Sequence, residues 1–337
     1  MKISIVLTAY NAEAHLRDTL NSFIAQTHSD WEAICIDDGS TDTTGDILDS
    51  YAVKDERIKV KHHHNKGPSE CRNEGVELST GEYITFCDAD DMIAPHWFSN
   101  AATEISNSRP QLLRCHFSFA EELPPDFFVM KAAKVERVII GRHDCMQWSW
   151  QVFFTEGYVW LNFIRADLKP YIRFSDMRLK EDTMMLVNLT PHLTEVVQSN
   201  DCGYFYRRTP CSLSRSKRAA KTVQQVMDAL SDIWKRQHDL ADELGLLKEL
   251  RHAIQKFADN DVIDWAINSA PEPRNEKLLV RKAWINLHNC GAFDGSYSHR
   301  LFMYFPFQLW KVAGLDFPIK MTWKLYLVAR MMFRRKR

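Results

Sequence analysis

Three aspartates, Asp88, Asp90 and Asp91, follow directly on a short apolar run over residues 83–87. The run holds aromatic, β-branched and small apolar residues, which predicts a buried strand that ends in an acidic turn. Carboxylates this close repel one another unless a cation lies between them, and their oxygens suit Mg²⁺ or Mn²⁺ bridged to a phosphate. The pattern therefore predicts a site for a metal ion and a diphosphate. The alternative is that these side chains cap the following helix, although one aspartate would be enough for a cap.

The elements that must position this turn alternate along residues 1–90. Strands are predicted at residues 3–7, 31–36, 57–61 and 83–87, with apolar residues at helical spacing between them. This alternation implies βαβ units and a mostly parallel sheet flanked by helices. A second acidic strand end, residues 37–42, falls on the same carboxyl edge, where ligands bind in open α/β sheets. The predicted class is therefore α/β with a Rossmann-like nucleotide-binding half; without G-x-G-x-x-G, a dinucleotide cofactor is disfavoured.

Several short motifs occur in a fixed order along these residues, and together they resemble family 2 glycosyltransferases of the GT-A fold. The motifs are Tyr10-Asn11, Gln26-Thr27, residues 37–42, Asn65-x-Gly67, Arg72-Asn73-x-Gly75, residues 81–84 and Asp88-x-Asp90-Asp91. Thr8 stands where the family usually has proline. The resemblance is to the bacterial surface-polysaccharide type. It implies an inverting transferase with a nucleotide-diphosphate-sugar donor, expected to be a UDP-sugar, and Mn²⁺ or Mg²⁺ as cofactor.

The resemblance also implies roles on the donor side. Asp38 is expected to accept a hydrogen bond from the base, and Asp90 to bind the metal ion directly. Asp88 is expected at the ribose or at the metal ion. The guanidinium of Arg208 and the hydroxyl of Ser212 are candidates to hold the diphosphate. The other residues expected around the donor nucleotide are Thr8, Tyr10, Asn11, Asn65 and Arg72.

The acceptor side is expected in two later segments. Residues 157–165 resemble the family segment that lines the acceptor, with Trp160 as a candidate sugar platform; the alternative is that Trp160 packs in the core. Glu181-Asp182 resembles the family motif that opens a helix at the active site. Asp182 is expected to take the proton from the acceptor hydroxyl as general base, with Glu181 on the acceptor side. The alternative for Asp182 is a helix N-cap.

Residues 1–215 are expected to form the catalytic domain, in which residues 111–119, 137–140 and 196–206 each predict a further strand. Residues 216–337 predict a helical C-terminal region, because apolar residues recur at helical spacing over 223–234 and 244–254. Its basic and aromatic end, residues 323–337, leaves two interpretations open. It is either an amphipathic helix on an anionic membrane surface or a helix packed on the catalytic domain with a solvated tail.

Composition narrows the class of protein further. The net charge of the 337 residues is −1, which argues against nucleic acid as a partner. The eight cysteines contain no C-x-x-C pair, so a reducing, cytoplasmic compartment is expected, peripheral to the inner face of the plasma membrane if the basic end binds lipid. No signal peptide or membrane span is predicted. A metal site at His62–His64 is disfavoured, because side chains alternate along a strand.

These observations predict a metal-dependent inverting glycosyltransferase that moves a sugar to a hydroxyl of a glycan or lipid-linked acceptor, in cell-surface polysaccharide or lipopolysaccharide synthesis. One alternative is a non-catalytic sugar-nucleotide-binding or scaffold protein on the same fold, against which the intact acidic turn and Glu181-Asp182 argue. Another is a sugar-1-phosphate nucleotidyltransferase. That class should carry a glycine-rich, arginine-containing loop after the first strand, where this chain has residues 8–11, TAYN.

Overall fold

A computed structural model describes residues 1–120, 133–155, 157–177, 180–207, 223–250 and 254. The chain divides into two compact units. One contains Met1–Ala219 and Asp239–Leu246, and the other contains Ala220–His238 and Leu247–Arg337. All the predicted site residues belong to the first unit.

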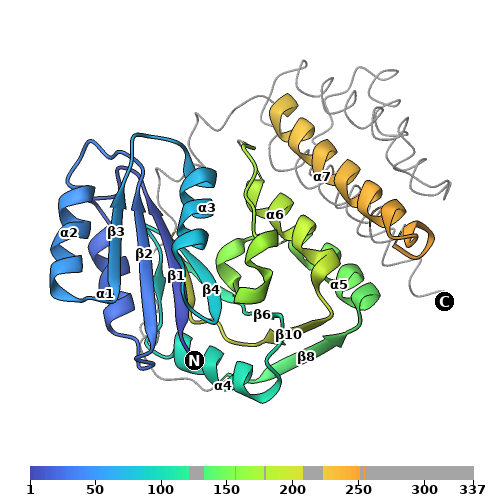
Figure 1. Cartoon of the computed structure of the whole chain (residues 1–337), viewed down its shortest axis with the longest axis horizontal. Helices are drawn as coiled ribbons and strands as arrows, with labels where there is room; N and C mark the ends of the chain where they lie inside the picture. The colour runs from blue at the N-terminus through green and yellow to red at the C-terminus, as the bar shows by residue number, and fades with distance from the viewer. Residues whose placement is uncertain (121–132, 156, 178–179, 208–222, 251–253, 255–337) are drawn as a thin grey trace, which may run out of the picture. The chain divides into compact units, whose positions relative to one another are not determined.

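Parallel strands and helices alternate through the first part of this unit (Figure 1). The strands pair in parallel in the order β3-β2-β1-β4; they are β1 (Ile3–Ala9), β2 (Trp31–Asp37), β3 (Ile58–His62) and β4 (Tyr83–Asp88). The connecting helices are α1 (Leu16–Ile24), α2 (Thr44–Lys54) and α3 (Pro68–Leu78). Helices α1 and α2 lie on one face and α3 on the other, because the strand order reverses after β3 while the crossovers keep one hand. The predicted alternation of parallel strands and helices is confirmed.

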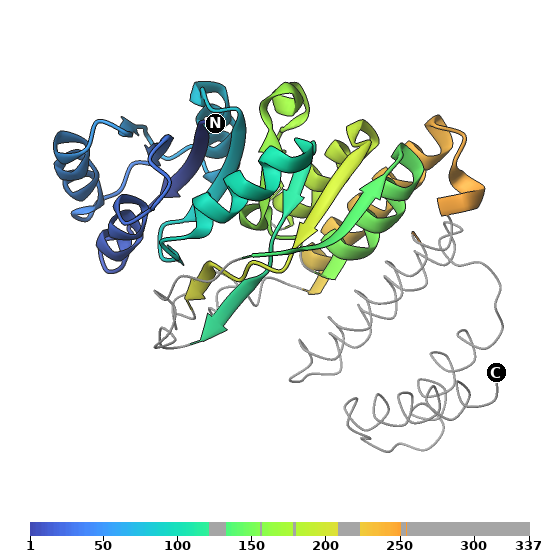
Figure 2. The same ribbon diagram turned by 90° about the horizontal axis from the view of Figure 1, so that it is seen from below.

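Four further strands extend the sheet beyond β4 in the order β9-β6-β10-β8. Their bounds are β6 (Leu112–Arg114), β8 (Val135–Ile140), β9 (Asn162–Arg165) and β10 (Glu195–Ser199). Strand β9 is antiparallel to both of its neighbours, so the whole sheet is mixed with a parallel half. The helices of this part are α4 (Trp97–Ser108), α5 (Arg142–Thr155) and α6 (Glu181–Leu189), with 3₁₀ turns η1 (Val159–Leu161), η2 (Ala166–Tyr171) and η3 (Thr190–His192). Figure 2 shows β8 and β10 side by side.

Two of the predicted strands are wrong in one respect, because each divides between two sheets. Residues 111–119 form β6 and then β7 (Phe117–Ala120), and residues 196–206 form β10 and then β11 (Tyr204–Arg207). The later halves pair in a small sheet, β5-β11-β7, in which β5 is Met92–Ile93. The segments that follow β6 and β10 leave the large sheet side by side. The N–H of His116 in the first segment donates to the carbonyl of Asp201 in the second at 2.7 Å. This crossing carries β11 to the turn after β4.

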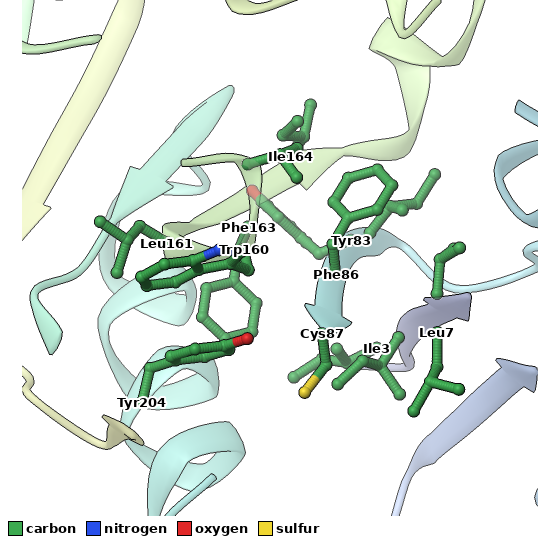
Figure 3. Close-up of a cluster of buried hydrophobic side chains, with 14 of the residues drawn as sticks. Ile3, Leu7, Tyr83, Phe86, Cys87, Trp160, Leu161, Phe163, Ile164 and Tyr204 are labelled. Carbon is green, nitrogen blue, oxygen red and sulfur yellow. The ribbon is translucent and has the colours of Figure 1, made fainter. Parts of the chain in front are cut away.

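The buried core lies where β1 and β4 meet η1 and β9. Figure 3 shows Ile3 and Leu7 of β1, Tyr83, Phe86 and Cys87 of β4, and Trp160, Phe163 and Ile164 from the later segment. Beyond this core, a buried carboxylate, Glu32, joins the other ends of the strands. It accepts hydrogen bonds from Lys2, Lys59, Ser4 and Thr80. These bonds tie together the amino ends of β1 and β2 and the segment that leads into β4.

The second unit contributes the predicted helix over residues 223–234, which is confirmed as part of α7 (Val223–Glu243). In the part of the chain that the structure describes, no helix is both long enough and apolar enough to cross a membrane. The basic segment at residues 323–337 lies outside the described residues.

Candidate active site

The turn after β4 holds Asp91 inside the protein. The Asp91 carboxylate is fully buried, accepts a hydrogen bond of 2.6 Å from the hydroxyl of Tyr204, and accepts another of 2.8 Å from the backbone N–H of Arg207. Burial, together with the charges of Asp88 and Asp90, raises the pKa of Asp91 well above its usual range. Asp91 therefore anchors the turn to strand β11.

Asp88 and Asp90 are the two carboxylates of this turn that remain for a ligand. Burial and the negative charge of Asp88 raise the pKa of Asp90 to about 6, a repulsion that a divalent cation would relieve. No group of three His, Cys, Asp or Glu side chains suited to a metal ion occurs among the described residues. The pair fits the usual Mg²⁺ arrangement, in which one or two carboxylates are joined by phosphate oxygens and water.

The alternative of helix capping is wrong for this turn. Helix α4 begins at Trp97, with His96 at the N-cap position and no side chain hydrogen-bonded to the cap. The three aspartates therefore lie in the turn for another reason.

Asp38 organises the turn that carries Asn65. Its two carboxylate oxygens accept the backbone N–H groups of Lys66 at 2.6 Å and Gly67 at 2.9 Å. The backbone N–H of Asp38 donates to the carbonyl of Ala9 at 2.9 Å, which ties this turn to the end of β1. These backbone donors account for a buried aspartate at this position.

The other residues expected around the nucleotide gather at the same edge of the sheet. Thr8 is in register with Asp88 across β1 and β4. Tyr10 follows β1 and is 52% exposed, while Asn11 has a left-handed backbone (φ 50°) and accepts the N–H of Thr41 at 2.8 Å. The structure therefore brings Thr8, Tyr10, Asn11, Asp38 and Asn65 together at the carboxyl ends of β1, β2 and β3.

Arg72 of α3 lies among three carboxylates from two other elements. Its Nη1 is 2.9 Å from Glu181 Oε1 and 3.3 Å from Asp182 Oδ1, and its Nη2 is 3.4 Å from Asp88 Oδ1. Although burial disfavours the charged guanidinium, these carboxylates outweigh it and raise the pKa of Arg72. Arg72 thus links the acidic turn after β4 to the start of α6.

Asp182 is the second residue of α6, and its carboxylate is only 17% exposed. Oδ2 lies 3.5 Å from the backbone N–H of Val159. Oδ1 forms the ion pair with Arg72 but accepts no hydrogen bond among the described residues. Burial raises the pKa of Asp182 to about 7, with Glu181 and Asp88 adding to the effect and Arg72 opposing it. A carboxylate with a pKa near neutrality is suited to accept a proton in catalysis.

The N-cap interpretation of Asp182 is wrong. Lys180 occupies the N-cap position in a left-handed conformation (φ 63°), and no side chain bonds to the cap. A lysine in this region of backbone space is uncommon, and such conformations cluster at functional sites.

Trp160 is buried, with 2% of its surface exposed. Its ring stacks on Tyr204 at 4.1 Å and on Tyr158 at 4.7 Å between centroids. Figure 3 shows the Trp160 and Tyr204 rings lying over one another. The structure therefore places Trp160 in the core and does not offer its face as a sugar platform. Glu181, the other residue expected on the acceptor side, bonds to Arg72.

The sequence did not predict the roles of Tyr204 and Arg207, two residues of β11 that hold Asp91. Besides its bond to Asp91, Arg207 donates from Nε to the carbonyl of Asp90 at 3.0 Å and from Nη2 to Asp18 at 2.9 Å. The sequence does indicate a strand here, from the alternation of Tyr204 and Tyr206 before the arginines. This local pattern cannot indicate which turn of the protein the strand contacts. Arg208 and Ser212, the predicted diphosphate contacts, lie outside the described residues.

The histidine run is held by carboxylates. His62 Nδ1 lies 3.0 Å from Asp37 and its Nε2 lies 3.0 Å from Asp49, and His63 pairs with Glu74. The hydrogen bonds that the His62 ring makes to the carboxylates of Asp37 and Asp49 raise the pKa of His62. These contacts give His62 and His63 structural partners at the end of β3.

Comparison with known proteins identifies the kind of enzyme domain and its fold. The family model for glycosyl transferase family 2 matches residues 4–153, a range that includes the acidic turn and Arg72. Residues 4–153 are a glycosyl transferase family 2 domain. Glycosyltransferase GlyG of Streptococcus pneumoniae is 26% identical over 235 residues, which are 68% of this chain and 78% of GlyG. An uncharacterised glycosyltransferase of Bacillus subtilis, EpsJ, is 29% identical over 63% of this chain and 62% of its own length.

A solved structure shares the GT-A fold of this glycosyltransferase. TarS of Staphylococcus aureus, crystallised as residues 1–349 in complex with UDP-GlcNAc, superposes with a TM-score of 0.65 at 19% identity. The match covers 85% of this chain and 79% of that structure. The predicted family and fold class are confirmed.

Proposed function

We propose that this glycosyltransferase moves a sugar, with inversion, from a UDP-sugar to a hydroxyl of a glycan or lipid-linked acceptor. The reaction would depend on Mn²⁺ or Mg²⁺ and would serve cell-surface polysaccharide or lipopolysaccharide synthesis. The complex of TarS with UDP-GlcNAc supports this choice of donor. The choice of pathway follows from the resemblance of the motifs to the bacterial surface-polysaccharide type. We assign the chemistry to residues 1–215 and place the enzyme in the cytoplasm, with residues 216–337 as the candidate contact to the membrane.

The observation that carries the proposal is that Arg72 contacts three carboxylates, which lie in two separate segments of the chain. One contact is Asp88, in the turn that we assign to the donor, and the others are Glu181 and Asp182. Because Asp88 and Asp182 both contact the guanidinium of Arg72, they lie close enough to act on a donor and an acceptor bound side by side. A scaffold protein would need no carboxylate with a pKa near 7 at this point.

On the donor side, we propose that Asp88 and Asp90 would hold the metal ion. When bound, the ion would neutralise charge on the leaving diphosphate. Thr8, Tyr10, Asn11, Asp38, Asn65 and Arg72 would surround the nucleotide, and Asp91 keeps the turn in place through Tyr204. Arg208 and Ser212 remain our candidates for the diphosphate.

On the acceptor side, Asp182 would accept the proton of the attacking hydroxyl. As that oxygen forms its bond to the anomeric carbon, the bond to the diphosphate breaks on the opposite face, which inverts the configuration. The transition state would have oxocarbenium character, as in glycoside hydrolysis. Glu181 would keep Arg72 paired, so that the guanidinium does not fully neutralise Asp182.

Calorimetric titration of UDP and GDP, each with Mn²⁺ and with a chelator, tests the donor half of the proposal. We expect UDP to bind only with the ion, and the Asp90→Ala variant to lose this binding. The matched control is Asp144→Ala, which removes an exposed aspartate of α5. Preference for GDP would keep the mechanism and change the donor, whereas binding of neither nucleotide would overturn the proposal in favour of a scaffold.

A further inference from the structure

The two peptide groups that flank Asp90 are each held by a side chain from another element. On one side, the hydroxyl of Thr19 in α1 donates to the carbonyl of Ala89 at 2.9 Å. On the other side, Nε of Arg207 donates to the carbonyl of Asp90 at 3.0 Å. Rotation about the backbone bonds of Asp90 would turn one of these carbonyls away from its donor, because each peptide group moves as a plane. The two contacts therefore fix the direction in which the Asp90 side chain leaves the turn.

The two side chains that hold these peptide groups are also joined to each other. Nη2 of Arg207 lies 2.9 Å from Oδ2 of Asp18, the neighbour of Thr19 in α1. Thr19 is fully buried, and a second carbonyl, one turn back in its own helix, lies 3.5 Å from its hydroxyl. The bond to Ala89 is shorter and is thus the stronger of the two. Helix α1 and strand β11 therefore enclose the acidic turn through Thr19, Asp18 and Arg207, a set that we call the Asp90 bracket.

The Asp90 bracket holds a carboxylate where electrostatic repulsion would move it. Asp88 and Asp90 carry the same charge in one short turn, and they repel each other when no cation lies between them. If the turn were free to relax, Asp90 would rotate away, and binding of an ion would then have to restore its position. A site whose ligands are already held in place binds without the cost of this reorganisation.

We propose that Thr19 is a positioning residue for the metal ion, which sets the direction of the Asp90 carboxylate through the carbonyl of Ala89. Arg207 would do the same from the other side of the turn. This inference rests on the proposed function, in which Asp88 and Asp90 hold Mn²⁺ or Mg²⁺. Because Thr19 acts through the backbone, loss of its hydroxyl should weaken binding of the ion and leave the type of reaction unchanged.

The test is a titration of the full chain with Mn²⁺ at a fixed excess of UDP, in which electron paramagnetic resonance measures the free ion. Thr19→Val nearly keeps the shape of the side chain and removes its hydroxyl. This change should weaken Mn²⁺ binding about tenfold, the low end of the loss seen when a group that orients a metal ligand is removed. Thr19→Ser keeps the hydroxyl and should bind Mn²⁺ as the wild-type protein does. Wild-type Mn²⁺ affinity in Thr19→Val would overturn the inference.

The matched control is Ser22→Ala. Ser22 is another buried hydroxyl of α1, but it accepts the N–H of Ile93 at 3.2 Å, in β5 and beyond the acidic turn. We expect this variant to keep the Mn²⁺ affinity of the wild-type protein, with any loss confined to the melting temperature. If Ser22→Ala weakened Mn²⁺ binding as much as Thr19→Val, general loosening of α1 would explain both results and the inference would be wrong.

Hydrogen exchange in the metal-free protein separates this inference from the proposed function. The N–H of Asp91 donates to the carbonyl of Asp88 at 3.2 Å across the turn, so its exchange rate reports how firmly the turn is held. Exchange at Asp91 should be faster in Thr19→Val than in Ser22→Ala or the wild-type protein. Equal exchange in the three proteins would overturn the Asp90 bracket alone. Absence of Mn²⁺ binding by the wild-type protein would refute the proposed metal site and, with it, the role of Thr19.

Discussion

The guanidinium of Arg72 lies 3.3 Å from the carboxylate of Asp182 and joins helix α3 to the first turn of α6. The next residue, Asn73, strengthens this joint: its side-chain amide donates to the carbonyl of Phe174 at 2.9 Å and accepts the N–H of Phe174 at 2.8 Å. The Phe174 ring also lies beneath Arg72 at 5.5 Å. Helix α3 therefore positions the segment that leads to the general-base candidate, and it also sets the charge beside that group.

The first prediction concerns the ionisation of Asp182. Because its pKa is raised to about 7 and the base must be deprotonated, kcat/KM should fall as the pH is lowered through about 7. Asp182→Asn should reduce kcat by about 10²–10⁴-fold while UDP affinity stays unchanged. The measurement is a pH profile of transfer with calorimetry alongside. Transfer at wild-type rate by this variant would remove Asp182 from the mechanism.

The second prediction concerns Arg72 as the group that lowers the pKa of Asp182. In Arg72→Gln the acidic limb of the kcat/KM profile should move to higher pH, by about 1–3 units, because an adjacent cation no longer favours the carboxylate. The control is Arg173→Gln, which breaks an exposed pair with Glu77 and should leave the limb in place. Since loss of Arg72 also leaves carboxylates unpaired, melting curves should accompany the rates. A limb at the wild-type pH in a folded Arg72→Gln enzyme would contradict this assignment.

The order of the elements could be predicted from the sequence, because each strand and helix of the first half leaves a local pattern. The acidic ends could also be assigned to one edge, since parallel strands end together. Local patterns do not report which sheet a strand joins. The patterns at residues 111–119 and 196–206 therefore each predict one strand, where the structure has two in different sheets. The bond between Tyr204 and Asp91 spans 113 residues and has no local signal. For the same reason, the sequence leaves open whether Trp160 packs in the core or faces the acceptor.

The third prediction concerns the buried carboxylate of Glu32. Burial alone would raise its pKa, but hydrogen bonds from Lys2, Lys59, Ser4 and Thr80 outweigh this and hold the pKa of Glu32 well below its usual range. A depressed pKa stabilises the fold above the unfolded-state value of about 4.3, and this stabilisation is lost as the pH falls further.

Glu32→Gln should therefore lower stability at pH 7 by about 1–3 kcal/mol and by less at pH 3. The measurement is thermal melting at both pH values, with Glu56→Gln as an exposed control. An equal loss at the two pH values would show that the charge of Glu32 does not contribute.

The last prediction concerns Gly75, the glycine of the Arg72-Asn73-x-Gly75 motif. A Cβ at this position would lie 2.3 Å from Cγ1 of Val6, which is buried in β1 between β2 and β4. Alanine favours a helix over glycine by about 1 kcal/mol, but overpacking of a core typically costs about 1–3 kcal/mol and a paired strand cannot move aside.

Gly75→Ala should therefore lower the urea midpoint and loosen the contact that seats α3, and with it Arg72, on the sheet. The comparison is Gly45→Ala in α2, where the nearest atom would be 3.3 Å away and the effect should be smaller. Combining Gly75→Ala with Val6→Ala should cost less than the sum of the two, because the second change removes the clashing methyl groups. Additive losses would mean that close packing of α3 on β1 is not the reason for glycine at this position.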